Sequence, residues 1–128
     1  MKVLLDTHTL LWATLSPSSL SDGAAAVITD EANTVLVSAA SAWEIATKVR
    51  LGRLPGAERL EQEFLDLMED AGYTLRSIHP EDALRAGRLA SDHRDPFDRM
   101  IAAQALADDI PVISADAKLD TFNIRRIW

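Results

Sequence analysis

The stretches Val3-Leu4-Leu5-Asp6 and Val35-Leu36-Val37-Ser38 decide the fold, because each is a short, continuous apolar run that ends at a polar residue. Continuous apolar runs of this length are typical of strands buried on both faces, as in a parallel sheet. Further short strands are predicted at residues 74–78, 112–114 and 124–127. The chain therefore carries four to five candidate strands spread over its whole length.

Helical patterns lie between these strands. Helices are predicted at residues 21–32, 41–51 and 57–71, after Pro80, and after Asp95-Pro96. The 57–71 segment is amphipathic, with acidic residues around an apolar stripe. Strands that alternate with helices predict one α/β domain over residues 1–128, with a mainly parallel sheet of four to five strands flanked by helices.

The composition narrows the functional classes. The 128 residues suffice for one domain, and 48% of them are apolar, which is enough to build a core. The chain has no cysteine, which excludes disulfides, thiolate metal sites and thiol nucleophiles and favours a reducing cytoplasm. No stretch approaches the roughly 18 apolar residues of a membrane span. We expect the N-terminus to belong to the fold, because Asp6 interrupts the first apolar run.

Four acidic residues occupy positions where a parallel sheet would gather them. Asp6 follows the first strand and Asp116 the fourth, whereas Glu44 and Asp98 lie in the first turns of predicted helices. Ligands of such sheets bind beyond the carboxyl ends of the strands. Crowded carboxylates repel one another unless a cation neutralises them, and oxygen ligands without His or Cys favour Mg²⁺ or Mn²⁺. The pattern predicts a divalent-metal site.

Local structure offers another explanation for some of these acids. Ser41 and Glu44 have the spacing of a capping box, and Glu44 also has Lys48 one helical turn later. Asp98 would stand at the third position of a helix capped by Asp95, where a carboxylate favours the helix dipole. Each acid taken singly is thus compatible with a purely structural role.

The joint pattern resembles a known family. In order and spacing, four segments resemble the acidic motifs of PIN-domain nucleases, especially the VapC-type toxins of bacterial toxin–antitoxin pairs: LLDTHTLLW (4–12), SAASAWEIATK (38–48), DPFDRMIAAQA (95–105) and VISAD (112–116). The resemblance covers essentially the whole chain and implies that Asp6, Glu44, Asp98 and Asp116 form the acidic metal site. Asp120 also follows the fourth strand and is an alternative to Asp116. Asp95 is interpreted as a helix cap.

The resemblance also implies an activity and partners. It implies a metal-dependent endoribonuclease that cuts single-stranded or loop RNA with a metal-activated water, leaving a 3′-hydroxyl and a 5′-phosphate. A cognate antitoxin protein and a homodimer are further implications. The number of metal ions, the RNA target and the identity of the antitoxin stay open.

Substrate contacts are predicted at several further residues. Four basic residues flank the Glu44 helix and could meet RNA phosphates, although the protein carries a net charge of −7: Lys48, Arg50, Arg53 and Arg59. The alternative is that they are solvated charges paired with the acidic segment that follows. Thr7 is a candidate for orienting Asp6 or a metal-bound water, with simple turn chemistry as the alternative. Arg99 is a candidate for clamping a phosphate or carboxylate, with a plain surface arginine as the alternative.

Three competing interpretations remain at this point. A receiver-like signalling domain would use the lysine of Asp116-Ala117-Lys118, but the chain lacks a phosphoacceptor aspartate after the middle strand. A haloacid-dehalogenase-type phosphatase would need a second aspartate where His8 stands, and His8 is expected to be packed at a helix start. A PIN-like module that binds RNA or a partner without cutting is the third.

Overall fold

The centre of the molecule is one parallel sheet. The computed structural model describes residues 1–128, and its five strands run in the order β3-β2-β1-β4-β5 with every neighbouring pair parallel. The strands are β1 (Lys2–Leu5), β2 (Thr34–Ser38), β3 (Thr74–Arg76), β4 (Val112–Ile113) and β5 (Arg126–Ile127). The predicted α/β class and parallel sheet are confirmed, and the last three strands are shorter than the predicted ranges.

Helices connect the strands. They are α1 (Thr7–Leu15), the 3₁₀ turn η1 (Pro17–Ser19), α2 (Asp22–Thr29), α3 (Ala39–Arg50), α4 (Glu58–Gln62), α5 (Phe64–Asp70), α6 (Pro80–Arg88), α7 (Pro96–Asp108) and the 3₁₀ segment η2 (Ala117–Phe122). The predicted starts at Pro80 and Pro96 are confirmed, and Ser21 caps α2 through the backbone N–H of Ala24. None of these helices combines the length and apolar character that crossing a membrane requires.

The structure corrects three details of the predicted helices. Helix α3 begins at Ala39 with Ser38 as its cap, so the capping box between Ser41 and Glu44 is wrong. The predicted 57–71 helix breaks at Glu63 into α4 and α5, although Leu60, Phe64 and Met68 of its apolar stripe are buried as the pattern required. No range was predicted for helix α1, although a helix start was expected at His8, because its apolar residues do not form a stripe on one face.

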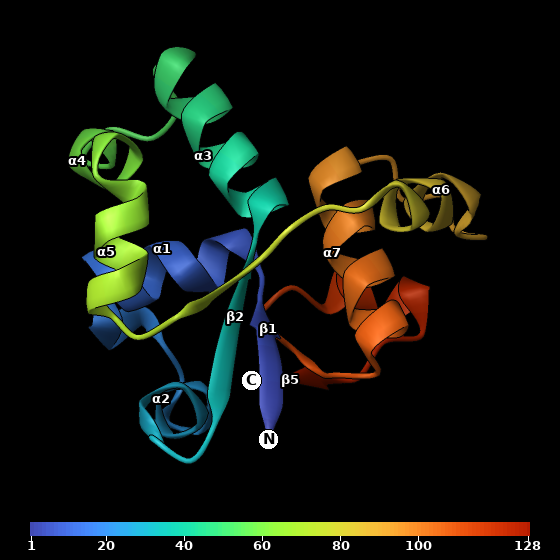
Figure 1. Cartoon of the computed structure of the whole chain (residues 1–128), viewed down its shortest axis with the longest axis horizontal. Coiled ribbons are helices and arrows are strands. Elements are labelled where there is room, and N and C mark those ends of the chain that lie inside the picture. Colours follow the sequence, from blue (N-terminus) through green and yellow to red (C-terminus); the bar gives the residue numbers. More distant parts are fainter.

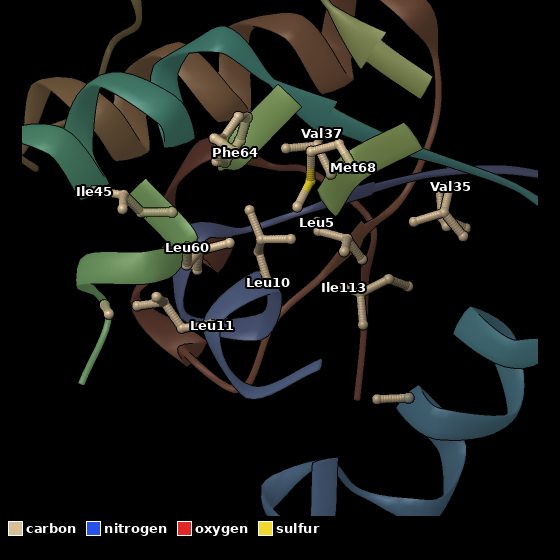
Figure 2. Packing of buried hydrophobic residues seen from close by; sticks show 13 residues of the cluster. Leu5, Leu10, Leu11, Val35, Val37, Ile45, Leu60, Phe64, Met68 and Ile113 are labelled. Carbon is tan, nitrogen blue, oxygen red and sulfur yellow. The ribbon is translucent and has the colours of Figure 1, made fainter. Parts of the chain in front are cut away.

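Strands β1, β2 and β4 are buried on both faces because their apolar runs are continuous. Val3 and Leu5 of β1 and Val37 of β2 belong to one buried cluster of 13 residues, shown in Figure 2. Leu4 and Leu36 point the other way and belong to a second cluster of 10 residues. Side chains alternate across a strand, so each run supplies both clusters, and helices cover both faces of the sheet.

The order of the strands creates a switch point at β1. From β1 the chain proceeds to β2 and β3 on one side, then crosses to β4 and β5 on the other. Helices α1, α2, α4 and α5 lie on one face of the sheet, and α6 and α7 lie on the other (Figure 1). Crevices form at such points beyond the carboxyl ends of the strands, which places the candidate site next to Asp6.

Arg76, the last residue of β3, ties α6 and α7 together. Its guanidinium donates two hydrogen bonds to Asp82, at 2.9 and 3.0 Å, and two to Asp108, at 2.8 and 3.2 Å. Asp82 is 3% exposed. Burial alone would raise the pKa of Asp82, but the hydrogen bonds from Arg76 and from the backbone N–H of His79 lower it below its usual value.

Replacing Arg76 by Met should lower the free energy of unfolding at pH 7 by about 3–5 kcal/mol, because a buried carboxylate then loses its partner. Urea unfolding followed by circular dichroism measures the change. The exposed pair Arg59–Glu63 supplies the control, since Arg59→Met should cost about 0–1 kcal/mol. Equal losses in the two variants would contradict this account of Arg76.

Candidate active site

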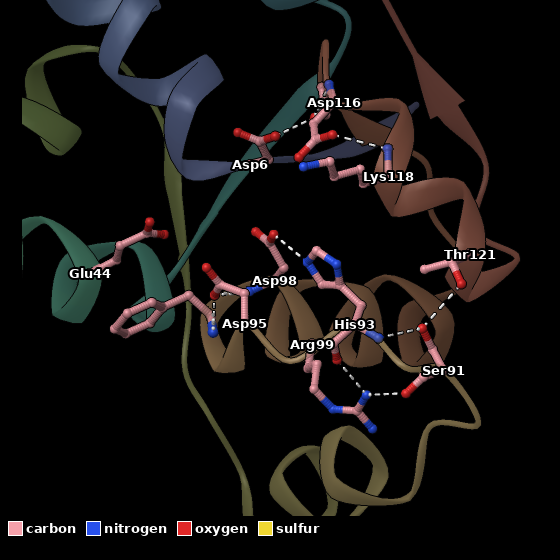
Figure 3. A network of polar contacts seen from close by, with 12 residues as sticks. Asp6, Glu44, Ser91, His93, Asp95, Asp98, Arg99, Asp116, Lys118 and Thr121 are labelled. Atoms are coloured by element: carbon pink, nitrogen blue, oxygen red, sulfur yellow. Dashed lines mark hydrogen bonds and ion pairs between the residues drawn. The ribbon is translucent and has the colours of Figure 1, made fainter.

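A pocket of about 390 Å³ lies at the switch point. We call it the acidic pocket, because five carboxylates and one lysine are among its ten residues: Asp6, Thr7, His8, Trp12, Glu44, Lys48, Asp95, Asp98, Ala115 and Asp116. These residues come from the end of β1, from α1 and α3, from the start of α7 and from the loop after β4. The structure thus brings the four predicted acids to one place (Figure 3).

Asp6 is held firmly at the base of the acidic pocket. It caps α1, and its Oδ1 accepts a hydrogen bond from the backbone N–H of Thr9 at 3.1 Å. Its Oδ2 accepts a short hydrogen bond from the hydroxyl of Ser114, the residue after β4. Burial raises the pKa of Asp6 above its usual value, and these two hydrogen bonds oppose the rise. Asp6 therefore joins the ends of two neighbouring strands.

Asp98 stands in the first turn of α7, as the sequence indicated. Asp95 caps this helix, and one carboxylate oxygen of Asp95 accepts hydrogen bonds from the backbone N–H groups of Phe97 and Asp98. Burial raises the pKa of Asp98 to about 6. The negative charges of Asp95 and Asp6 add to the rise, whereas a hydrogen bond with His93 opposes it. The predicted cap at Asp95 is present, and Asp95 also lines the acidic pocket.

Glu44 lies one turn further into α3 than expected. It is 6% exposed, and its Oε2 forms the predicted ion pair with Lys48. Its Oε1 is buried and has no hydrogen-bond partner within the protein. A buried polar atom without a partner is costly, so this oxygen marks a position where a cation or a donor would stabilise the pocket.

The structure distinguishes the two candidates for the fourth acid by position. Asp116 lines the acidic pocket and caps η2 through the backbone N–H of Lys118. Asp120 lies outside the pocket and pairs with Arg126 at 2.9 Å. The Arg126 guanidinium lowers the pKa of Asp120 below its usual value. Position therefore favours Asp116 over Asp120.

The acidic pocket suits a hard divalent cation in its donor chemistry. Its carboxylates offer only oxygen, the ligand that Mg²⁺ and Mn²⁺ prefer, and the unpartnered Oε1 of Glu44 is available to a cation. No three His, Cys, Asp or Glu side chains lie close enough to hold one ion jointly. A cation that takes three of them as ligands therefore requires the carboxylates to approach one another more closely.

Two of the predicted substrate residues have other partners. Arg99 does not line the acidic pocket, because its guanidinium donates hydrogen bonds to main-chain carbonyls on α6 and in the loop before α7; the predicted clamp is corrected to a structural role. The Thr7 hydroxyl lines the pocket and shares a hydrogen bond of 2.9 Å with the hydroxyl of Ser41, which links α1 to α3; it makes no hydrogen bond with Asp6.

The basic candidates differ in position. Lys48 lines the acidic pocket and holds Glu44. Arg50 and Arg53 are exposed beyond it, at the end of α3 and just after, and neither takes part in an ion pair. The alternative prediction, that they pair with the acidic segment that follows, is wrong for these two arginines and is confirmed for Arg59, which pairs with Glu63.

Sequence reasoning missed several residues around the acids. His93 bonds to Asp98 and Ser114 to Asp6, and both contacts depend on how loops fold back. His8, which was expected to be packed, is exposed and lines the acidic pocket with Trp12, at 5.0 Å between ring centroids. The i,i+4 spacing of His8 and Trp12 was the one signal available in the sequence, and it required knowing that α1 is a helix.

Comparison with known proteins places the chain in a family. The sequence profile of the PIN domain matches residues 3–124, which is nearly the whole chain. The chain belongs to the PIN domain family. This membership removes the receiver-like and dehalogenase-like interpretations, and divalent-metal dependence is general among ribonucleases of this family.

Individual relatives agree with this membership. The PIN domain is 42% identical over 66 residues to Ribonuclease VapC16 of Mycobacterium tuberculosis, an alignment that covers 52% of this chain and 45% of that protein. The alignment thus spans about half of the curated relative. Two solved structures share the fold over 98% of the chain. VapBC2 from Rickettsia felis, bound to a promoter DNA fragment, has a TM-score of 0.70 and 17% sequence identity, and 97% of that chain is covered. VapBC-1 from nontypeable Haemophilus influenzae has a TM-score of 0.66 and 16% sequence identity, and 96% of that chain is covered.

The raised pKa of Asp98 gives a stability prediction for the PIN domain in EDTA. Ionising a group whose folded pKa is raised destabilises the fold, so the stability that Asp98 contributes is present below about pH 4 and is lost as the pH rises through about 6. Asp98→Asn should therefore be more stable than the wild type at pH 7.5, by about 1–3 kcal/mol. Urea unfolding between pH 4 and 8 measures the difference in unfolding free energy between the two proteins. A difference that does not increase with pH would contradict the prediction.

Proposed function

We propose that this chain is a divalent-metal-dependent endoribonuclease and the toxin of a VapC-type toxin–antitoxin pair. The observation that carries the proposal is the convergence of Asp6, Glu44, Asp98 and Asp116 on one pocket at the switch point of a PIN domain. The name of the relative Ribonuclease VapC16 supports the same reaction class.

Mg²⁺ or Mn²⁺ is the proposed cofactor, with Asp6, Asp98, Glu44 and Asp116 as the ligands available to it. When bound, such a cation lowers the pKa of a water molecule and neutralises charge on the phosphodiester. Hydrolysis by water would leave a 3′-hydroxyl and a 5′-phosphate. No side chain of the pocket has to act as a nucleophile.

The chain's own residues have distinct tasks in this proposal. The hydrogen bonds from Thr9 and Ser114 fix the carboxylate of Asp6. Lys48 holds one oxygen of Glu44 and leaves the other without a protein partner. Because Lys48 is the only lysine or arginine of the acidic pocket, it is also the group best placed to receive a substrate phosphate.

Unpaired RNA is the proposed substrate class. The rings of His8 and Trp12 line the acidic pocket and offer a face on which an unstacked base can lie. Proteins that bind single-stranded RNA combine such stacking surfaces with positive charge along the backbone path. Arg50 and Arg53, exposed and without ion pairs, are the proposed outer contacts for the backbone.

An antitoxin protein and a second copy of the chain are the proposed partners, and the cytoplasm is the proposed location. The structural neighbours from R. felis and H. influenzae are described as VapBC assemblies, which supports an antitoxin partner. A PIN-like module that binds RNA without cutting is the alternative, and the cleavage experiment separates the two.

Asp98→Asn and Asp6→Asn should each lower RNA cleavage by at least about 100-fold, because a ligand carboxylate is lost in each. The assay incubates a mixed RNA pool with Mg²⁺ or Mn²⁺ and sequences the fragments. EDTA should abolish cleavage by the wild type. Asp120→Asn changes an acid outside the pocket and is the matched control; its RNA cleavage should stay within a few-fold of the wild-type activity. Activity that survives EDTA, or equal activity of Asp98→Asn, would contradict the proposal.

Replacing Arg50 and Arg53 together by Ala should weaken binding of a single-stranded RNA and flatten its dependence on salt. Two phosphate contacts fewer should lower the slope of log affinity against log salt by about 1.4. Fluorescence anisotropy with the Asp98→Asn protein at several salt concentrations measures this without cleavage. Arg59→Ala supplies a control, since Arg59 is paired with Glu63. An unchanged slope would remove both arginines from the RNA path.

A further inference from the structure

The side chain of His93 forms a hydrogen bond with Asp98, and it forms none with the other acids of the acidic pocket. The Nε2 atom of His93 lies 2.8 Å from Oδ2 of Asp98. Asp98 lines the acidic pocket, whereas His93 does not. An ionised carboxylate only accepts hydrogen bonds, so with Asp98 ionised the Nε2–H of His93 is the donor and Oδ2 of Asp98 is the acceptor.

The ring of His93 is held in place by the surrounding residues. It meets the ring of Phe122 edge-on, at 5.4 Å between centroids and 90° between planes. The backbone N–H of His93 donates to the hydroxyl of Ser91 at 3.2 Å, and that hydroxyl lies 3.1 Å from the hydroxyl of Thr121 on η2 (Figure 3). The side chain of His93 is 18% exposed.

Arg99 fixes the same segment from the other side. Its guanidinium donates to the carbonyls of Leu89, Ser91 and His93, at 2.7, 3.0 and 2.9 Å. Arg99 follows Asp98 directly on α7. One turn of α7 therefore presents Asp98 to the acidic pocket and, through Arg99, anchors the loop that carries the partner of Asp98.

We propose that His93 is a positioning residue that fixes the orientation of the Asp98 carboxylate for a divalent cation. The inference rests on the proposed function. By occupying Oδ2, His93 leaves Oδ1 as the oxygen of Asp98 free for the acidic pocket. It also offsets part of the repulsion that Asp98 meets from Asp6 and Asp95. Partners that orient a metal-binding side chain in this way affect metal affinity by about 10–100-fold when they are removed.

The test compares His93→Phe, which keeps an aromatic ring against Phe122 but has no donor, with His93→Gln, which restores a side-chain N–H. The probe is Mn²⁺ alone, titrated into the RNA-free protein by calorimetry. His93→Phe should bind Mn²⁺ about 10–100-fold more weakly than the wild type, with a melting temperature in EDTA within a few degrees. His93→Gln should recover most of the affinity.

Activity adds a second readout. With RNA as substrate, kcat of His93→Phe should fall at low Mn²⁺ and recover at high Mn²⁺, whereas KM for RNA should stay unchanged. In the double variant His93→Phe/Asp98→Asn, Mn²⁺ should bind no more weakly than in Asp98→Asn, because His93 acts through Asp98. A wild-type Mn²⁺ affinity in His93→Phe would overturn the proposal, as would a failure of Gln to restore it.

The experiment separates this inference from the proposed function. If Asp98→Asn weakens Mn²⁺ binding but His93→Phe does not, only the role of His93 fails. If Asp98→Asn binds Mn²⁺ as well as the wild type, the proposed metal site fails. Nitrogen coupling from His93 in the pulsed EPR spectrum of bound Mn²⁺ would show direct ligation, which also contradicts a positioning role.

Discussion

Repulsion between carboxylates in one partly buried pocket is the constraint on which the rest of this structure depends. Carboxylates that share a pocket disfavour one another's ionisation, and loss of water strengthens the effect. The fold counters this with a side-chain partner for three of these acids. Ser114 donates to Asp6, Lys48 pairs with Glu44, and His93 bonds to Asp98. The pKa values of Asp6 and Asp98 stay raised, mainly by burial, and in Asp98 also by the negative charges of Asp95 and Asp6.

The sheet makes this crowding possible. Parallel strands end at the same edge, so residues far apart in the sequence arrive together without any local sequence signal that pairs them. Asp6 and Ser114 are 108 positions apart and are in contact because β1 and β4 are neighbours. The buried apolar runs fix this arrangement, since shifting a strand by one residue would exchange the two faces that the helices cover.

The parts of the fold that were predictable are those set by local pattern. Continuous apolar runs located β1, β2 and β4, and Pro80 and Asp95-Pro96 located two helix starts, because these signals act over a few residues. Position after a strand or at a helix start also located Asp6 and Asp98. The start of α3 was misplaced because Ser38 and Ser41 both suit a cap, and only the end of β2 decides between them.

The contacts that tune the site were not predictable from pattern. His93 lies in the loop before α7, and its bond to Asp98 depends on Arg99 and on the position of Phe122 against the ring. Arg99 looked like a substrate clamp because it follows Asp98, but the helix turns it away from the pocket and toward the loop carbonyls. Sequence adjacency to an acid is therefore a poor guide to function on a helix, where neighbours point in different directions.

The same electrostatics bears on how an acidic protein meets RNA. A pocket with five carboxylates and one lysine repels a phosphodiester, so in the proposed reaction the affinity for RNA depends on the cation that the carboxylates bind. Coupling of this kind is reciprocal: a cation that strengthens RNA binding is itself bound more tightly when RNA is present. Arg50 and Arg53 lie outside the carboxylates, so they would contact the RNA before its phosphate reaches the cation. The acidic charge of the pocket therefore makes RNA binding depend on the bound metal and does not prevent it.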